Sequence, residues 1–259
     1  MIRTVTVTRY VSPLREGGSL PAIVEADDEG MYVLKFRGAG QGPKALIAEL
    51  VAGELARSAG LPVPEIVFAE LDAALARTEP DPEIQDLIRA SGGINLALDY
   101  LPGSLPFDPV VERPDATLAS SIVWFDAFIS NVDRTVRNTN LLMWHRQLWM
   151  IDHGAAFYVH HGNDPFVDRS GDRFPMIHSH VLLPFAEALP EAGAMITERF
   201  SAEEVRRIVD LIPDIWLGNH PAYEGPGPHR DAYQNYLMLR LEQQQGFLEE
   251  AIRARTQNI

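Results

Sequence analysis

The sequence predicts an α+β fold with two lobes, a strand-rich lobe over residues 1–100 and a helix-rich lobe over residues 101–259. Two observations predict this division. Short segments with alternating apolar residues dominate the first hundred residues, whereas apolar residues at helical spacing dominate the remainder. The change falls at Leu101-Pro102-Gly103, where proline and glycine interrupt both patterns. A strand-rich part followed by a helix-rich part is typical of α+β architecture.

In the first lobe we expect a small sheet and two helices. The first helix spans residues 44–59, where leucine, isoleucine and valine recur at helical spacing and Gly60 stands just past the end. The second is short and spans residues 81–91, closed by two glycines. The strands are segments rich in alternating apolar and β-branched residues, and they span residues 3–10, 20–36 with a turn at 27–30, 63–71 and 94–100.

The second lobe begins with the segment 116–130, which is apolar on nearly every side and therefore predicts a buried helix. Two short apolar runs at 141–144 and 148–151 predict a hairpin. Three further segments have helical spacing, and proline and glycine cluster in an expected surface loop at 218–229. These three helices are expected at residues 180–191, 201–212 and 230–254.

The composition excludes several classes of partner. The formal net charge is −14, so we expect neither nucleic acid nor an anionic membrane as the main partner, because their phosphates would be repelled. No apolar run is long enough to predict a transmembrane helix, and residues 1–8 alternate like a strand instead of forming the core of a signal peptide. Cysteine is absent, which rules out disulfides and thiolate chemistry and leads us to expect a cytoplasmic protein.

Asp133, Asn138 and Asp152 form the strongest functional pattern. Asn138 lies five positions and Asp152 nineteen positions after Asp133. In phosphoryl transfer of the protein-kinase type, a first aspartate orients and deprotonates an acceptor hydroxyl. An asparagine and a second aspartate hold Mg²⁺ against the nucleotide phosphates. We therefore assign Asp133 and Asn138 to catalysis and Asn138 and Asp152 to the metal, with Asn140 as the alternative to Asn138.

Lys35 ends an apolar strand, where a lysine commonly extends its ammonium into solvent. A helix that carries carboxylates follows, so we expect Lys35 to bind nucleotide phosphates and to form an ion pair. Two partners are open. Glu54 falls within the apolar stripe of the helix and would need a buried partner, whereas Glu49 lies on the opposite side. We favour Glu49, because a glutamate of this kind faces the cleft and not the core of its own lobe.

Two glycine-rich segments flank the lysine strand. Gly17, Gly18 and Ser19 precede it and are expected to bring backbone N–H groups close to phosphate. The second segment, residues 38–44, opens the first helix but lacks the Gly-Lys-Ser/Thr pattern of a Walker loop. We expect it to be a flexible connector in which Lys44 could add a phosphate contact.

The remaining polar residues are expected to have structural roles. The histidines do not have the spacing of zinc ligands, so a metallohydrolase is set aside, and we expect them to face solvent or cap helices. Asp126 is expected to accept hydrogen bonds from the backbone of the loop at Asp133, and Asn131 and Arg134 to brace that loop. The five histidines considered are His153, His160, His161, His178 and His180.

The pattern Asn131-x-Asp133-Arg134-x-x-x-Asn138, closed by Ile151-Asp152, resembles the HipA-like kinases and, more distantly, the type II phosphatidylinositol 4-kinases. The similarity covers roughly residues 10 to 160. His153 stands where protein kinases carry the phenylalanine of Asp-Phe-Gly. A second stretch agrees with the order of features in HipA-like proteins, and it consists of Tyr32-Val33-Leu34-Lys35-Phe36, Glu49, Leu55-Ala56 and Gly60-Leu61-Pro62-Val63-Pro64.

The resemblance implies a bilobal protein-kinase-like fold that binds ATP and Mg²⁺ between its lobes. It also implies a bacterial serine/threonine kinase that transfers the γ-phosphoryl group to a protein, with adenine bound beside Asp99, Tyr100 and Leu101. Two alternatives stay open, a lipid or small-molecule kinase and a nucleotide-binding pseudokinase that acts as a scaffold. The sequence also leaves open the phosphoryl acceptor, autophosphorylation, a toxin–antitoxin role and the oligomeric state.

Overall fold

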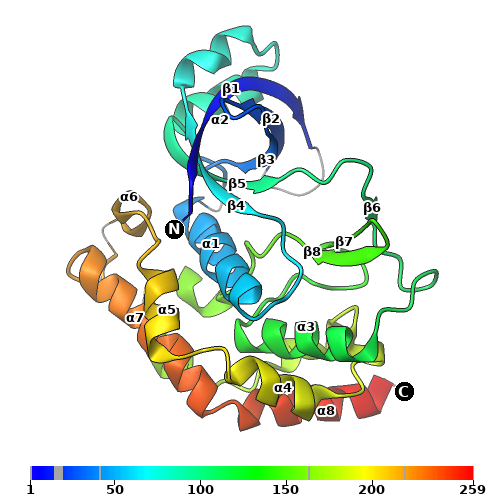
Figure 1. Cartoon of the computed structure of the whole chain (residues 1–259). Coiled ribbons are helices and arrows are strands. Elements are labelled where there is room, and N and C mark those ends of the chain that lie inside the picture. The colour runs from blue at the N-terminus through cyan, green and yellow to red at the C-terminus, as the bar shows by residue number, and fades with distance from the viewer. Residues whose placement is uncertain (1, 15–19, 41, 163, 219, 259) are drawn as a thin grey trace.

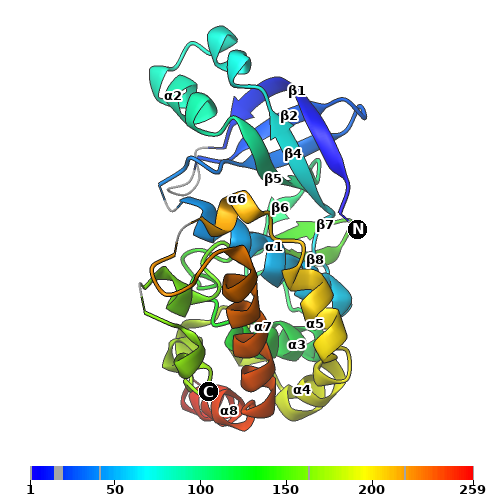
Figure 2. The same ribbon diagram turned by 90° about the vertical axis from the view of Figure 1, so that its left-hand side faces the viewer.

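The computed structural model confirms the α+β fold of two lobes, with a strand-rich part above a helical part (Figures 1 and 2). The described residues are 2–14, 20–40, 42–162, 164–218 and 220–258.

The strand-rich part is a closed barrel in the order β1-β2-β3-β5-β4. Neighbouring strands are antiparallel except for β1 and β4, which pair in parallel, with Val5 opposite Ala69. The closure was not predicted, because the β1–β4 pairing joins segments that lie far apart in the sequence. The five strands are β1 (Thr4–Pro13), β2 (Ala22–Ala26), β3 (Met31–Lys35), β4 (Ile66–Leu71) and β5 (Gly93–Asp99).

The alternation of side chains along β3 decides which residues point into the barrel and which point outward. Tyr32 and Leu34 are buried in the apolar core of the barrel, together with Ile84 and Ile88 of α2 (Pro82–Ala90). Successive side chains of a strand point to opposite faces, so Lys35 must leave the barrel on its outer side. That side faces α1.

Helix α1 (Gly42–Ser58) lies between the barrel and the helical part (Figure 1). Every residue from 46 to 53 is buried, and the helix contacts β4 and β5 on one side and α5 (Ala202–Val209) and α6 (Asp214–Leu217) on the other. The helix therefore has no solvent-facing stripe over its middle turns. This placement allows a charged residue of α1 to be fully buried on the side opposite its leucines.

The helical part is built around α3 (Ala116–Phe128), whose residues 119–128 are all buried. A three-stranded sheet in the order β6-β7-β8 lies between this helix and the barrel (Figure 1). Its strands are β6 (Leu105–Pro106), β7 (Leu141–Trp144) and β8 (Gln147–Met150), and the remaining helices are α4 (Leu189–Thr197), α7 (Pro226–Glu242) and α8 (Gln245–Asn258).

Two predicted helices are wrong in extent. Residues 180–191 contain one short 3₁₀ turn at Leu183–Phe185, and helix α4 begins only at Leu189. Pro184 lacks an N–H group to continue an α-helix, whereas Pro190 sits in the first turn of α4, where proline is tolerated. The predicted helix 230–254 is two helices, α7 and α8, because Phe247, Leu248 and Ala251 turn inward to join the main core.

Within the described residues, no helix is both long and apolar enough to cross a lipid bilayer.

Arg240 of α7 is fully buried and connects three segments of the helical part. Its guanidinium donates to Phe128 O and Ala127 O, each at 2.6 Å, at the C-terminal end of α3. It also donates to Ser170 O at 2.8 Å and Asp172 O at 2.9 Å. Carbonyls at a helix C-terminus lack N–H donors from their own helix and carry partial negative charge. The buried guanidinium supplies both the missing donors and a positive charge.

We expect Arg240→Met to lower the free energy of unfolding by roughly 2–4 kcal/mol, because four carbonyl groups would each lose a donor and three of these contacts are buried. Urea unfolding of the variant measures this loss. Arg89→Met is the matched control, since Arg89 is mostly exposed and pairs with the exposed Asp86 of its own helix; its loss should be below about 1 kcal/mol. Equal losses in both variants would show that the carbonyl contacts of Arg240 contribute little.

Candidate active site

Asp133 lies in the loop that follows α3, and three amide-bearing residues hold it. Its backbone N–H donates to Asn131 Oδ1 at 3.2 Å. Asn138 Nδ2 donates to Asp133 Oδ2 at 2.8 Å, and Asn140 Nδ2 donates to the backbone oxygen of Asp133 at 2.8 Å. Among the described residues, Oδ1 of Asp133 is left without a hydrogen-bond donor. Burial, followed by the charge of Asp152, raises the pKa of Asp133, although the two amides oppose the shift.

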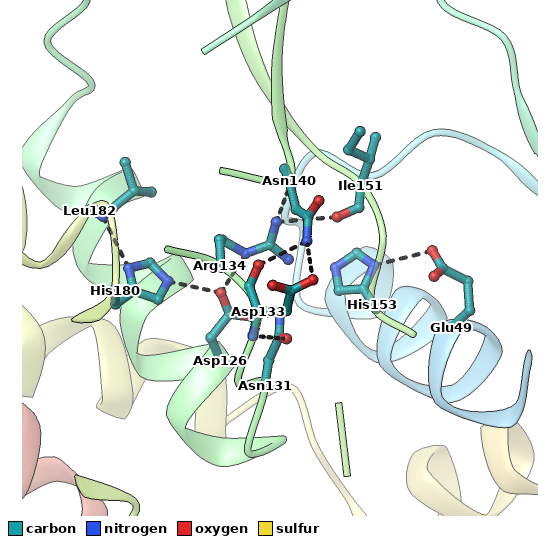
Figure 3. A network of polar contacts seen from close by, with 10 residues as sticks. All are labelled: Glu49, Asp126, Asn131, Asp133, Arg134, Asn140, Ile151, His153, His180 and Leu182. Carbon is teal, nitrogen blue, oxygen red and sulfur yellow. Dashed lines mark hydrogen bonds and ion pairs between the residues drawn. The ribbon is translucent and has the colours of Figure 1, made fainter. Parts of the chain in front are cut away.

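A buried polar network beneath this loop centres on Asp126 of α3 (Figure 3). Asp126 accepts from Arg134 Nε at 2.5 Å, from Asn131 Nδ2 at 3.0 Å and from His180 Nε2 at 2.9 Å. Leu182 N donates to His180 Nδ1 at 3.0 Å, so the ring proton of His180 belongs on Nε2. Burial alone would raise the pKa of Asp126, but Arg134 and His180 outweigh it and hold the pKa below its ordinary range.

Arg134 extends this network to the loop after β8 that carries Asp152. Its guanidinium is fully buried and donates to Asn140 O and, at 3.2 Å, to Ile151 O. Arg134 and Asn131 therefore brace the loop, as expected from the sequence. Asp126 differs from its expected role, because its carboxylate binds side chains and not the loop backbone.

Lys35 bridges two carboxylates that come from different segments of the chain. Its ammonium lies 2.7 Å from Glu49 Oε2 on α1 and 2.5 Å from Asp152 Oδ1 on the loop after β8. Glu49 is fully buried, whereas the side chain of Asp152 is 43% exposed. Burial would lower the pKa of Lys35, but the charges of Asp152 and Glu49 raise it above its ordinary value, so the ammonium stays charged.

The partner of Lys35 is Glu49 and not Glu54, which lies 3.3 Å from Arg57 of its own helix. The helical-wheel argument for Glu54 fails because α1 is buried on both sides. Burial would raise the pKa of Glu49, but Lys35 outweighs it and, with His153, holds the pKa at about 2. Glu49 is therefore ionised although no water reaches it.

The turn Asp152-His153-Gly154 lies in contact with the first turns of α1. Asp152 has a φ of 54°, a left-handed backbone conformation that is uncommon outside glycine. A Cβ atom added to Gly154 would meet Asp152 Oδ1 at 3.4 Å and Ala45 at 3.8 Å. These are ordinary van der Waals distances, so the turn and the helix are in contact but a Cβ atom would fit between them. The strained aspartate directs its carboxylate at Lys35. Strained residues of this kind concentrate at functional sites.

The segment 99–101, expected to bind adenine, connects β5 to the helical part. The N–H of Asp99 donates to Glu65 O at 2.8 Å, and the N–H of Tyr100 donates to Met31 O at 3.0 Å. Both donors are therefore engaged by the barrel. In the described part of the chain the N–H of Leu101 has no such backbone partner.

Other predicted residues are placed differently or are not described. Gly17, Gly18 and Ser19 lie outside the described residues. Lys44, considered as a phosphate contact, donates to His160 O at 2.6 Å and Gly162 O at 3.2 Å.

The expectation that the histidines face solvent or cap helices is wrong for three of them. His153, His160 and His180 are buried, although His180 also caps Leu182 N. His160 hydrogen-bonds to Tyr233 and His180 to Asp126. Spacing along the chain could not show these partners, which come from distant helices.

The donors at Asp152 and Asn138 suit a hard divalent cation. The amide nitrogen of Asn138 is bound to Asp133, so its Oδ1 is the side-chain atom that could bind a cation, and Asp152 contributes a carboxylate. Both are oxygen donors of the kind that Mg²⁺ prefers. No cluster of three or more histidine, aspartate or glutamate side chains that could hold a metal occurs in the described ranges. Phosphate oxygens and water would therefore have to complete the coordination.

Comparisons with known proteins agree with this geometry. The profile of the HipA-like kinase family matches residues 7–245. The fold is similar to that of the Helicobacter pylori proinflammatory kinase CtkA, with a TM-score of 0.57 and 13% identity over 98% of this chain and 99% of that one. It is also similar to the Golgi casein kinase with Mn/ADP bound, with a TM-score of 0.53 and 12% identity over 96% of this chain and 73% of that one. No curated protein sequence matches.

We expect Asp126→Asn to lower the free energy of unfolding by roughly 3–5 kcal/mol, because the buried charge of Arg134 would lose its counter-ion. Chemical denaturation of the variant tests this. Asp86→Asn removes a carboxylate from a largely exposed pair with Arg89 and should cost less than about 1 kcal/mol. A loss no greater than that of Asp86→Asn would remove Asp126 from the centre of the network.

Proposed function

The chain belongs to the HipA-like kinase family and is a phosphotransferase of the kinase type, and we propose that it transfers the γ-phosphoryl group of ATP to a serine or threonine hydroxyl of a protein, with Mg²⁺ as its metal ion. One observation carries the proposal. Lys35, Glu49 and Asp152 meet at a single point in the cleft, within electrostatic reach of Asp133 on the loop that follows α3.

Each of these residues has a task in phosphoryl transfer. Lys35, held by Glu49, neutralises charge on the phosphates. Asp152 and Asn138 supply oxygen ligands to Mg²⁺, which bridges the phosphate oxygens and lowers their charge. The Golgi casein kinase structure, which contains Mn and ADP, supports a nucleotide and a divalent metal at a site of this fold. Asp152 must then exchange Lys35 for the metal, and its exposed side chain can make that exchange.

The adenine assignment rests on the segment 99–101. With the N–H groups of Asp99 and Tyr100 engaged by the barrel, the N–H of Leu101 would donate to the purine N1. In adenine this atom is an acceptor, whereas in guanine it carries a proton. This arrangement favours ATP over GTP.

Asp133 is the residue for the acceptor hydroxyl. Its Oδ2 is fixed by Asn138, so Oδ1 can orient the hydroxyl and accept its proton. Because burial raises the pKa of Asp133, its carboxylate is a stronger base than an exposed aspartate. The family supports a protein as acceptor. The net charge of −14 weighs against a phosphorylated lipid at an anionic membrane.

The decisive experiment is incubation with γ-labelled ATP and Mg²⁺, with and without a cell extract. We expect label on protein, and phosphoamino-acid analysis should place it on serine or threonine. Label confined to lipids or metabolites would move the acceptor class to the alternative kinases. Tight ATP binding without any transfer would make the chain a pseudokinase.

In that assay Asp133→Asn should lower the transfer rate by roughly two to four orders of magnitude, because orientation and proton acceptance are lost together. ATP affinity should stay unchanged, since Asp133 need not touch the nucleotide. Asp108→Asn, at an exposed aspartate outside the cleft, is the matched control and should keep full activity. A wild-type rate in Asp133→Asn would leave this residue as a loop brace only.

Asp152→Ala should abolish the tightening of ATP binding by Mg²⁺. It also releases Lys35 from one of its two carboxylates, so in EDTA the variant should bind ATP at least as tightly as the wild type. Calorimetry with Mg²⁺ and with EDTA, on both proteins, gives the four affinities. If Mg²⁺ tightens binding equally in both proteins, Asp152 is not a metal ligand.

A further inference from the structure

The two oxygens of Glu49 have different surroundings. Oε2 accepts from Lys35 at 2.7 Å. Within the described part of the chain Oε1 has no hydrogen-bond donor, and it faces Nδ1 of His153 at 3.5 Å. Both side chains are fully buried. Figure 3 shows the imidazole of His153 pointing from its turn toward the carboxylate on α1.

Glu49 and His153 each have a buried polar atom without a hydrogen-bond partner, and the two atoms could hydrogen-bond to each other. Both ring nitrogens of His153 also have no hydrogen-bond partner among the described residues. A buried carboxylate oxygen without a donor is costly, and so is a buried imidazole N–H without an acceptor. With a proton on Nδ1, a closer approach by about 0.6 Å would give a normal N–H···O bond.

His153 directly follows Asp152, so the position of its ring depends on what Asp152 binds. In this structure Asp152 is bound to Lys35. When Asp152 instead binds the metal ion, Lys35 loses one of its two carboxylate partners and keeps the other, Glu49. Any movement of the turn 152–154 also moves the ring of His153, whose Nδ1 lies 3.5 Å from Glu49 Oε1.

We propose that His153 is a positioning residue whose Nδ1–H holds Glu49 Oε1. It thereby ties the turn that carries Asp152 to the helix that supplies the partner of Lys35. This role rests on the proposed function of Asp152 and Lys35. A phenylalanine at this position could join turn and helix only by packing, whereas a histidine fixes the carboxylate in direction. The lysine and the metal ligand then adopt their nucleotide-binding positions together.

Three substitutions separate hydrogen bonding from packing. His153→Phe keeps an aromatic ring without a donor. His153→Asn places an amide nitrogen near the position of Nδ1, and His153→Gln places it near Nε2. We expect His153→Phe to weaken ATP binding in Mg²⁺ by about tenfold, the effect of losing one hydrogen bond to a charged group. His153→Asn should recover most of this affinity and His153→Gln should not.

A second measurement does not involve the nucleotide. Unfolding of the wild type, His153→Phe, Glu49→Met and the double variant forms a double-mutant cycle. If the two side chains are bound to each other, the double variant should lose less stability than the two single losses added together. Additive losses would overturn the proposal.

The two measurements keep this inference separate from the function on which it rests. A wild-type protein that binds no ATP would defeat the proposed function, while the cycle would still decide whether Glu49 and His153 are coupled. Equal ATP affinities in the Phe, Asn and Gln variants, with normal binding by the wild type, would defeat the role of His153 alone. Should His153→Phe fail to fold, the comparison of Asn with Gln still decides.

Discussion

The buried ion pair between Arg134 and Asp126 is the interaction on which the rest of the site depends. Asp126 belongs to α3, whose residues 119–128 are all buried, and Arg134 belongs to the loop that carries Asp133. Because the guanidinium also binds Asn140 O and Ile151 O, one side chain fixes both ends of the β7–β8 hairpin. A buried pair of this kind contributes little net stability compared with apolar packing. Its contribution here is geometric, since it sets the distance between the loop that carries Asp133 and the turn at residues 152–154.

A second constraint is that the ammonium of Lys35 forms ion pairs with two carboxylates. Lys35 is attached to the barrel, Glu49 to α1 and Asp152 to the loop after β8. The arrangement joins the barrel to the helical part. In the proposed function, phosphates and metal would enter by exchange of partners, with Lys35 gaining phosphate as Asp152 gains the metal. Glu49, which is fully buried, would remain the partner of Lys35.

The parts of this fold that local patterns determine could be predicted from the sequence. The strands of the barrel, the buried helix α3 and the β7–β8 hairpin lie close to their expected positions. Several failures come from contact between distant segments. Closure of the barrel requires β1 to pair with β4. The choice of Glu49 as the partner of Lys35 is correct, but the argument for Glu54 fails because α1 is enclosed on both sides. His180 is buried because it reaches Asp126 from 54 positions further along the chain.

The spacing of the site residues was predictable for a physical reason. The interval from Asp133 to Asn138 is the length of loop that returns the amide of Asn138 to Oδ2 of the aspartate. The interval from Asn138 to Asp152 is filled by the β7–β8 hairpin with short connections on either side. An inserted residue in either strand would shift the register, turning Leu141 and Met150 out of the core. The hairpin and the contacts of Arg134 at both of its ends therefore fix the spacing of the site residues together.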